Sequence, residues 1–518
     1  MRARVVAGNV GQLVRFLSYA FLVPIVVAFL FESQRPGSTI AGVFVPTSAF
    51  VFLVAFLVAL VLAFFLEAFA RAGDLRDHEA FVTVGASWVL ISALGAIPYV
   101  LSGVLANPLD AFFESLSGFT TVGATVLPAA STLGGLDWTD LYPESILFWR
   151  SFSQWLGGMG VIVLAVAVLP RLVATGASLV RAEGATAERV RPTVVKTARA
   201  FWGIYLLLTA AGAASLFLVL SIEKGLSPPR AAYDAVVHAM TSIATGGFTP
   251  SAGSVAALQS GAAEAVILVL MLLGGIGFAA HFHLLRGNPR RWIGDREIRF
   301  FLGMLATGFA ITFAMLFARG TDAAWQAFGG NVFDAARHVA FTVVSLQTTT
   351  GFASTNHDLL PDGARLILVP LMLAGGCLGS TAGGIKTLRI LVLLQAIRYE
   401  IYQTIHPRGR APMRVKDVVI DDPTLRSILA FLAAFLAAYV VSVVLLSLLG
   451  FDVMAALSAP AATLAGVGPA MGSVVGGPDF TYATIHPLAK VVLSFNMLLG
   501  RLEIFAVLLL FTPSTYRA

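Results

Sequence analysis

The chain has 518 residues, of which 58% are hydrophobic and only 12% charged, with a formal net charge of +6 and a mean hydropathy of +0.85. Soluble globular domains average about 45–50% apolar and about 25% charged residues, so this composition excludes an ordinary soluble enzyme or a disordered chain and favours an outer surface that faces lipid. The single cysteine, Cys377, excludes a secreted domain held together by disulfides.

Ten apolar segments are long enough to cross a bilayer, which requires about 20 apolar residues in a helix. They lie near residues 13–31, 47–70, 80–105, 145–170, 198–221, 263–286, 298–318, 364–398, 426–449 and 486–511. The first is predicted to remain as a span rather than to be cleaved as a signal peptide, because the polar residues 32–35 follow it in place of a small-residue cleavage site.

Basic residues are concentrated in three of the segments between these spans. Residues 171–199 contain six Lys and Arg residues, residues 286–299 contain five and residues 398–426 contain six, whereas none occurs between Val104 and Trp149. Cytoplasmic loops of membrane proteins carry an excess of Lys and Arg, so we expect these segments, and with an even number of spans both termini, on the cytosolic side. The sequence has no basic run with interleaved aromatic residues, so nucleic acid is not an expected partner.

Four shorter apolar segments lie between pairs of spans, and each ends in a turn rich in threonine and glycine. Each segment opens near an aspartate: Asp110, Asp234, Asp334 and Asp452. The four turns are Thr120-Thr121-Val122-Gly123, Ile243-Ala244-Thr245-Gly246 (followed by Gly247), Thr348-Thr349-Thr350-Gly351 and Ala465-Gly466-Val467-Gly468. This recurring order of span, half-helix, turn and span indicates a fourfold internal repeat.

The repeat predicts the architecture and its divisions. We expect an all-α polytopic membrane protein with four pseudo-fourfold repeats of span, half-helix, filter and span around one pore, preceded by two extra transmembrane helices. The predicted divisions are two leading helices at 1–72 and pore repeats at 73–191, 192–292, 293–415 and 416–518. Asn107-Pro108 and Ser227-Pro228 are expected to begin two of the half-helices, because Asn and Ser are good N-caps and proline suits the first turn.

Four such turns around one axis would surround a path with backbone carbonyl oxygens, which can replace the hydration shell of a monovalent cation. Irregular backbone at membrane depth is tolerated only where it is buried in protein or lines a wet cavity. Glycine reaches the required backbone angles, and the half-helices would point their negative ends at the path. We find no converging His, Cys and carboxylate residues, so the expected ligands are backbone carbonyls only. For any single turn, ordinary loop chemistry or close helix packing remains an alternative.

The segment 364–398 is interrupted by five glycines, Gly375, Gly376, Gly379, Gly383 and Gly384. Each costs a helix interior about 1 kcal/mol relative to alanine, so we predict a loop inside the membrane at 375–387. Close helix packing through small residues is the alternative, and a phosphate-binding loop fits less well because Ile385 rather than glycine precedes Lys386. Lys386, Arg501 and Glu503 lie in otherwise apolar segments and should face protein or water.

Several motifs are similar to one family. They are Trp149-Arg150-Ser151 with residues 154–160, residues 274–278 with His281, residues 379–387, and Gly500-Arg501-Leu502-Glu503. With the four turns, they make the chain resemble the Trk/Ktr/HKT superfamily of potassium transporters over nearly its whole length, and the two leading spans suit the Trk type. The fourth turn departs from the family pattern Asn-x-Gly-Pro-Gly, because Gly466 replaces the asparagine and Ala470 the final glycine.

The resemblance implies potassium uptake across the bacterial cytoplasmic membrane, with K+ as the transported ion, no cofactor and no enzymatic activity. It implies that the loop 375–387 gates the pore below the filter and that Arg501 acts with it as a positive barrier. It also implies a homodimer docked on a cytosolic ring of nucleotide-binding RCK-type regulatory subunits. Two alternatives are a secondary transporter with a midplane site for an organic substrate and a membrane-embedded enzyme, which would need a convergent catalytic set. Coupling to protons or sodium stays open.

Overall fold

The computed structural model describes every residue except 34, 36, 41–42, 72, 74, 168–193, 408–412, 416–417, 474, 476–479 and 514–518. Its helices are α1 (Ala3–Ala20), α2 (Leu22–Phe31), α3 (Thr47–Ala68), α4 (Asp77–Leu101), α5 (Pro108–Phe119), α6 (Trp138–Leu141), α7 (Glu144–Ala167), α10 (Val194–Glu223), α11 (Pro228–Ile243), α12 (Gly261–Gly275), α13 (Phe278–Leu285), α14 (Pro289–Ile293), α15 (Arg296–Arg319), α16 (Asp322–Ala327), α17 (Val332–Gln347), α18 (Asp362–Ala374), α19 (Thr387–Ile405), α20 (Asp422–Leu448), α21 (Val453–Ala465), α22 (Pro487–Arg501) and α23 (Phe505–Leu510). Two short antiparallel hairpins are formed by β1 (Gly37–Ile40) with β2 (Val43–Pro46) and by β3 (Arg414–Val415) with β4 (Val418–Val419).

Six of the ten predicted spans are single long apolar stretches. They are residues 3–31 (α1 and α2 together), 47–68, 79–101, 196–223, 296–319 and 422–448. The predicted span at 145–170 begins as α7 and then enters residues outside the described ranges, as does most of the basic segment 171–199. The long apolar helices and their exposed faces agree with a protein that spans a membrane several times.

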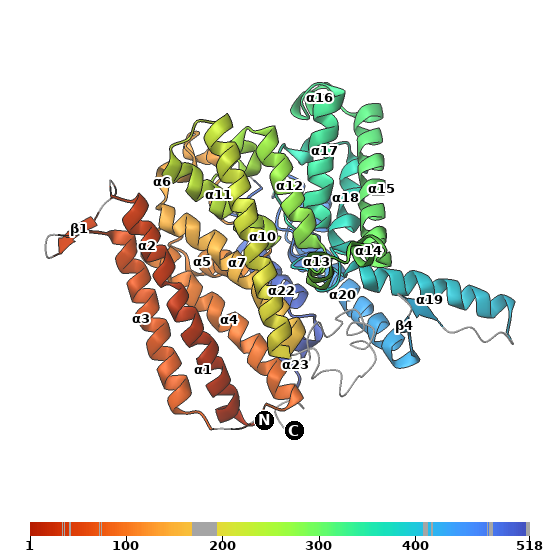
Figure 1. Ribbon diagram of the computed structural model, residues 1–518, viewed down its shortest axis with the longest axis horizontal. Helices are drawn as coiled ribbons and strands as arrows, with labels where there is room; N and C mark the ends of the chain where they lie inside the picture. Colours follow the sequence, from red (N-terminus) through yellow and green to blue (C-terminus); the bar gives the residue numbers. More distant parts are fainter. Residues whose placement is uncertain are drawn as a thin grey trace.

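The other three predicted spans are broken. A bend of 105° separates α12 from α13 at Ile276-Gly277, where the sequence predicts one helix over 263–286. The segment 364–398 is divided into α18 and α19 by the glycine-rich loop, as predicted, and α19 projects from the body of the molecule (Figure 1). The last predicted span ends early, because Glu503 and Ile504 have φ angles of 59° and 53° that separate α22 from α23.

Each repeat consists of a long first helix, a half-helix in the middle and a third helix. The sets are α4, α5 and α7, then α10, α11 and α12, then α15, α17 and α18, and finally α20, α21 and α22. In each set the middle helix packs on both of the others. Between sets, α7 packs on α11, α12 on α17, α18 on α21, and α22 on α5. The fourth set therefore returns to the first. The predicted all-α membrane fold is confirmed, and these contacts are consistent with the predicted repeats around one axis. α1–α3 lie to one side of this ring (Figure 1).

Ion pairs join the half-helix of one repeat to the last helix of another. Lys490 of α22 donates to Asp110 of α5 at 2.6 Å, which closes the contact between the fourth repeat and the first. Arg337 of α17 pairs with Glu264 of α12 at 3.0 Å, which links the third repeat to the second. These partly buried pairs specify which helices meet, because either charge left alone would be costly to bury.

The starts of the short helices match the sequence in part. Asn107 caps α5 by accepting a hydrogen bond from the Leu109 amide at 3.0 Å, as predicted. Ser227 precedes α11, but its side chain makes no capping bond. Asp452 is the N-cap of α21, whereas Asp234 lies two turns inside α11, so the four aspartates do not share one role.

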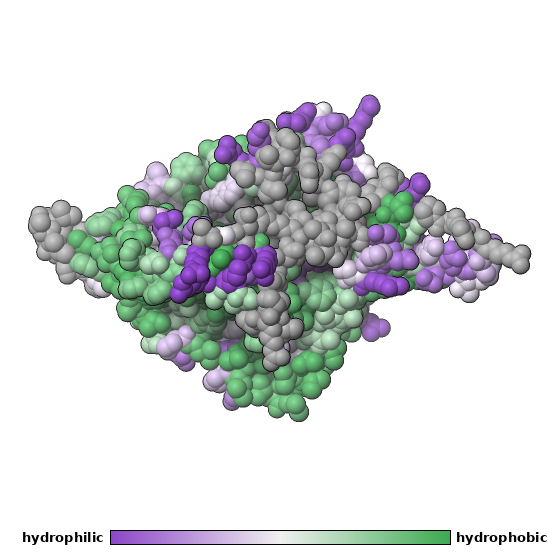
Figure 2. Space-filling view, turned by 90° about the horizontal axis from the view of Figure 1, so that it is seen from below, coloured by the Kyte–Doolittle hydropathy of each residue, from purple (hydrophilic) through white to green (hydrophobic). Residues whose placement is uncertain are grey.

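Large apolar side chains form much of the outer surface of the molecule. Phe64 on α3, Ile222 on α10 and Leu448 on α20 are 69%, 81% and 78% exposed. Seen from below, hydrophobic residues cover much of the rim, while hydrophilic residues gather nearer the middle and along the projecting end of the molecule (Figure 2). Exposed apolar patches of this extent are typical of a surface that contacts lipid or another protein.

Candidate functional site

The four turns share one backbone conformation. Thr121, Thr245, Thr349 and Gly466 have φ angles of 54°, 50°, 56° and 81°, and two residues later Gly123, Gly247, Gly351 and Gly468 have φ angles of 82°, 81°, 80° and 92°. Positive φ is uncommon for threonine, so its recurrence at three equivalent positions indicates a shared structural demand.

This conformation corrects the expected register of the second turn. Gly247, rather than Gly246, corresponds to Gly123 and Gly351, so the second turn comprises residues 244–247 and Ile243 is the last residue of α11. The sequence carries two adjacent glycines here, and spacing alone does not choose between them. In the fourth turn, Gly466 adopts the left-handed conformation that threonine has in the other three, so the departure from the family pattern preserves the backbone.

The four turns meet in a closed cycle. A β-carbon built on Gly123 would stand 2.1 Å from the carbonyl oxygen of Gly246. A β-carbon built on Gly247 would stand 2.0 Å from the carbonyl oxygen of Thr350. One built on Gly351 would stand 1.9 Å from the Val467 oxygen, and one built on Gly468 would stand 2.5 Å from the Val122 oxygen. Each glycine therefore lies against a carbonyl of the adjacent turn, and these equivalent oxygens, Val122, Gly246, Thr350 and Val467, form what we call the oxygen ring.

Threonine hydroxyls fasten the turns to their half-helices. Thr120 donates to the Leu116 carbonyl at 2.6 Å, and Thr348 donates to the Val344 carbonyl at 2.7 Å. These hydroxyl groups are thus already bonded within the protein. The polar groups that all four turns have in common are their backbone oxygens.

The glycine-rich loop between α18 and α19 lies directly against the turns. Thr381 donates from its hydroxyl to the carbonyls of Ile243 and Gly274 at 2.8 and 3.0 Å. The Gly383 amide donates to the Thr349 hydroxyl at 2.7 Å. The predicted loop inside the membrane thus contacts the second and third repeats at the ends of their half-helices.

Left-handed glycines fold this loop back on itself. Gly375, Gly379 and Gly384 have φ angles of 70°, 71° and 78°, and a β-carbon on Gly375 would stand 2.1 Å from the Gly383 oxygen. Gly376 approaches the Ala382 side chain in the same way. All five predicted loop glycines therefore fall in one compact segment.

Arg501 at the end of α22 fastens the loop to the first repeat. Its guanidinium donates to the Thr381 carbonyl at 3.1 Å and to the Gly157 carbonyl at 2.9 Å. Lys386 is buried, and its ammonium donates to the Ala382 carbonyl. Both predicted cations thus bond to the backbone of the loop: Lys386 belongs to it, and Arg501 lies beside it.

A narrow cavity lies between the turns and the loop. Its volume is about 30 Å³, and its lining includes Val122, Gly383, Lys386, Gly466 and Arg501. A volume of this size holds roughly two water molecules. The space on this side of the oxygen ring is therefore constricted, and its wall includes three cationic residues, Lys386, Arg389 and Arg501, together with the acidic Glu503.

A buried acidic residue that the sequence analysis did not select supports the loop from α15. Glu297 accepts a hydrogen bond from the Leu378 amide at 2.6 Å and one from the Thr387 hydroxyl at 3.2 Å. The sequence shows only a carboxylate at the start of an apolar span. Its role could not be predicted from that, because both partners lie more than 80 residues away along the chain.

Arg150 and Glu114 form a buried ion pair behind the first turn. They are 1% and 0% exposed, with the guanidinium Nε 2.7 Å from a Glu114 oxygen. Glu114 also accepts from the Val126 amide at 2.8 Å, and Arg150 donates to the Thr249 carbonyl at 2.9 Å. The pair therefore joins the segment after the first turn to the segment after the second. Arg150 is therefore enclosed within the protein and does not extend to its surface.

Glu114→Gln is expected to destabilise the folded protein by about 3 kcal/mol, because it leaves the Arg150 charge buried without a counter-charge. Arg150→Met should act similarly by isolating the carboxylate. The double variant should lose less stability than the sum of the losses in the two single variants. Thermal unfolding of the purified protein in detergent checks this, and additive losses in the double variant would contradict it.

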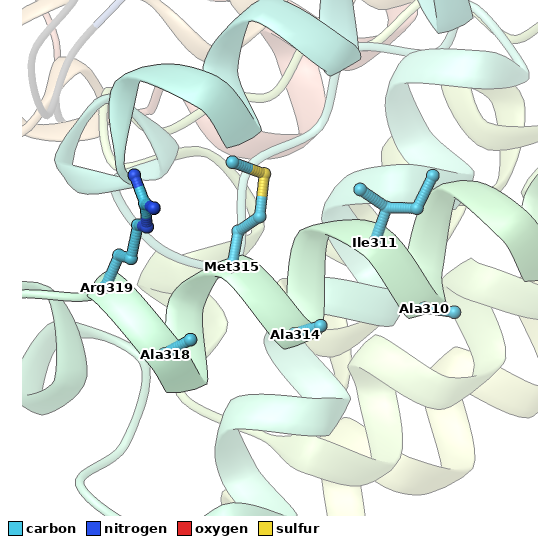
Figure 3. A pocket seen from close by; sticks show the side chains of 6 residues that line it. All are labelled: Ala310, Ile311, Ala314, Met315, Ala318 and Arg319. Atoms are coloured by element: carbon cyan, nitrogen blue, oxygen red, sulfur yellow. The ribbon is translucent and has the colours of Figure 1, made fainter.

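A second hollow, of about 360 Å³, lies along the outer face of α15 (Figure 3). Its lining is Ala310, Ile311, Ala314, Met315, Ala318 and Arg319. It contains none of the predicted site residues.

Within the described residues no group of three or more His, Cys, Asp or Glu side chains could hold a metal ion, and His281 bonds the Leu273 carbonyl at 2.8 Å.

Comparisons with known proteins agree on one family. A family model described as TrkH, cation transport protein, matches residues 48–516. The Trk system potassium uptake proteins TrkH of Salmonella typhimurium and of Escherichia coli K12 are each 34% identical over 528 residues, covering 100% of this chain and 100% of the relative. TrkI of Halomonas elongata is 34% identical over 449 residues, which is 86% of this chain and 85% of that protein. The crystal structure of the potassium transporter TrkH from Vibrio parahaemolyticus matches with a TM-score of 0.83 and 30% identity over 100% of both chains.

Proposed function

Because the chain belongs to the TrkH family of cation transport proteins, we propose that it carries potassium into the cell across the cytoplasmic membrane, through the space enclosed by the oxygen ring. The closed cycle of the four turns carries this proposal. Carbonyl oxygens grouped around one path replace the water around a monovalent cation, and the family relatives are named as potassium uptake proteins.

The residues proposed to line the ion path are those of the four turns: Thr120 to Gly123, Ala244 to Gly247, Thr348 to Gly351 and Ala465 to Gly468. The negative ends of the four half-helices face these turns and favour a cation. K+ is held by backbone oxygens, and no side-chain carboxylate belongs to the proposed set.

The loop of residues 375–387 and Arg501 are proposed as the gate. Support comes from the hydrogen bonds of Thr381 and Gly383 beneath the turns and from the 30 Å³ cavity between them. The guanidinium adds a positive charge next to the path, which opposes the passage of a cation. Opening then requires the loop to leave these partners.

Control from the cytosol, by a nucleotide-binding RCK-type partner bound to a homodimer, is the proposed regulation. Its support is the family membership and the basic segment 286–299, in which Arg290 and Arg291 are exposed on α14. Both termini are placed on the same cytosolic side in this proposal.

Flux measurements test the function. Purified protein in proteoliposomes should admit K+ and Rb+ well above the level of empty vesicles and should admit Na+ much less. A secondary transporter for an organic substrate would move none of these ions without that substrate. Equal Na+ and K+ uptake, or uptake no higher than in empty vesicles, would contradict the proposal.

A further inference from the structure

One of the four oxygens of the ring has a side-chain partner that distinguishes its quarter from the others. Gln154 of α7 is 0% exposed. Its amide nitrogen donates to the Gly246 carbonyl at 2.6 Å, and its amide oxygen accepts from the Phe248 N–H at 3.0 Å. Only one orientation of the amide satisfies both partners, so the two bonds fix the side chain against the second turn.

The corresponding positions in the other repeats are apolar. Gly157, Gly274 and Gly500 are equivalent, because β-carbons built on them meet the carbonyl oxygens of Phe119, Ile243 and Leu464, the last residues before the equivalent turns, at 2.0, 2.9 and 1.8 Å. Three residues before each of these glycines stand Gln154, Met271 and Met497, and the same spacing before Gly375 gives Met372. All four side chains are 0% exposed, so a single buried glutamine replaces methionine in the first repeat.

The second turn differs from the other three at the residue that contacts Gln154. Its ring residue is Gly246, where the other turns have Val122, Thr350 and Val467. A β-carbon on Gly246 would stand 2.5 Å from both Cδ and Oε1 of Gln154. Unlike Gly247, Gly246 is not in the left-handed region, so its backbone would accept alanine. The glutamine amide occupies the space that a side chain takes in the other turns.

We propose that Gln154 is a positioning residue for ion selectivity, which fixes the Gly246 carbonyl oxygen in the ring, and that residue 246 is glycine because Gln154 fills its side-chain space. This inference rests on the proposed function of the ring. A carbonyl that is held by a donor cannot turn or move inward as freely, and the field and position of these oxygens determine which cation is preferred. Selectivity thus depends on one side chain that does not touch the ion.

The first test replaces Gln154 by the methionine of the other repeats. Gln154→Met should lower the ratio of K+ to Na+ uptake in proteoliposomes about tenfold, with a normal amount of folded protein. Met271→Leu is the matched control, because it changes the same position of the next repeat within an apolar site, and it should leave the ratio unchanged. A purely structural role would reduce the amount of protein or the total flux without changing the ratio, and an unchanged ratio in Gln154→Met would overturn the proposal.

The second test examines the coupling of the two positions. Gly246→Ala should lower K+ uptake at least about tenfold, since its β-carbon would collide with the held amide. Adding Gln154→Ala should restore part of that uptake, because it vacates the space. A double variant no better than Gly246→Ala alone would overturn the coupling. These outcomes are separate from the proposed function, which fails only if the unaltered protein shows no K+ uptake above empty vesicles.

Discussion

Replacing Gly351 by alanine is expected to reduce K+ uptake at least about a hundredfold, to near the level of empty vesicles. Gly351 has a φ of 80°, and a β-carbon there would stand 1.9 Å from the Val467 oxygen and 2.5 Å from Pro469 Cδ. The left-handed conformation alone costs an L-residue about 1–2 kcal/mol. The collision adds to this cost, because backbone atoms of a packed turn cannot move aside as a flexible side chain can.

The measurement is Rb+ or K+ uptake by proteoliposomes that contain equal amounts of folded protein. Gly303→Ala is the matched control: Gly303 lies in α15, and a β-carbon there meets no atom within 4 Å. That variant should transport normally, since alanine favours a helix over glycine. Near-normal uptake by Gly351→Ala would mean that the closed cycle of turns is not the ion path.

Arg501→Ala is expected to raise K+ flux, by about tenfold. The guanidinium makes two hydrogen bonds that hold the loop to Gly157 and position Thr381 beneath the turns. A hydrogen bond from a charged group contributes about 1.5–3 kcal/mol, and about 1.4 kcal/mol changes an equilibrium tenfold. Alanine removes the positive charge as well, so both effects favour passage of a cation.

Two further variants separate these effects. Arg501→Lys keeps the charge but cannot reach both carbonyls as the planar guanidinium does, so its flux should lie between those of the unaltered protein and Arg501→Ala. Arg319→Ala removes an exposed arginine from the outer face of α15 (Figure 3) and should leave the flux unchanged. Unchanged or lower flux through intact Arg501→Ala protein would contradict the proposed barrier.

The fold could be predicted because its signals are local. Apolar length identifies the spans, and the repeated order of half-helix, threonine and glycine identifies the four quarters. The breaks at 276–277 and 502–504 were not predicted. The residues at 502–504 are Leu, Glu and Ile, which carry no glycine or proline, so tertiary contacts rather than local preference must hold Glu503 and Ile504 at positive φ.

The site was predictable where the backbone sets its geometry and was missed where distant side chains do. In three turns the predicted glycine is the one with positive φ at the equivalent position, whereas the adjacent Gly246 and Gly247 made the second turn ambiguous. Gln154 was noticed only as part of a motif. Its partner lies 92 residues away, and no periodicity connects an amide to a carbonyl at such a distance.

A ring assembled from one polypeptide has a consequence that a ring of identical subunits lacks. In a homotetramer, one amino-acid substitution alters all four subunits, so any loss of function arises at four positions at once. Here each quadrant is encoded separately, so a substitution such as the glutamine of α7 can arise on one side and be matched by a neighbour that loses its side chain. Under the proposal for Gln154, divergence of this kind would let ion preference change in small steps, one side of the circle at a time.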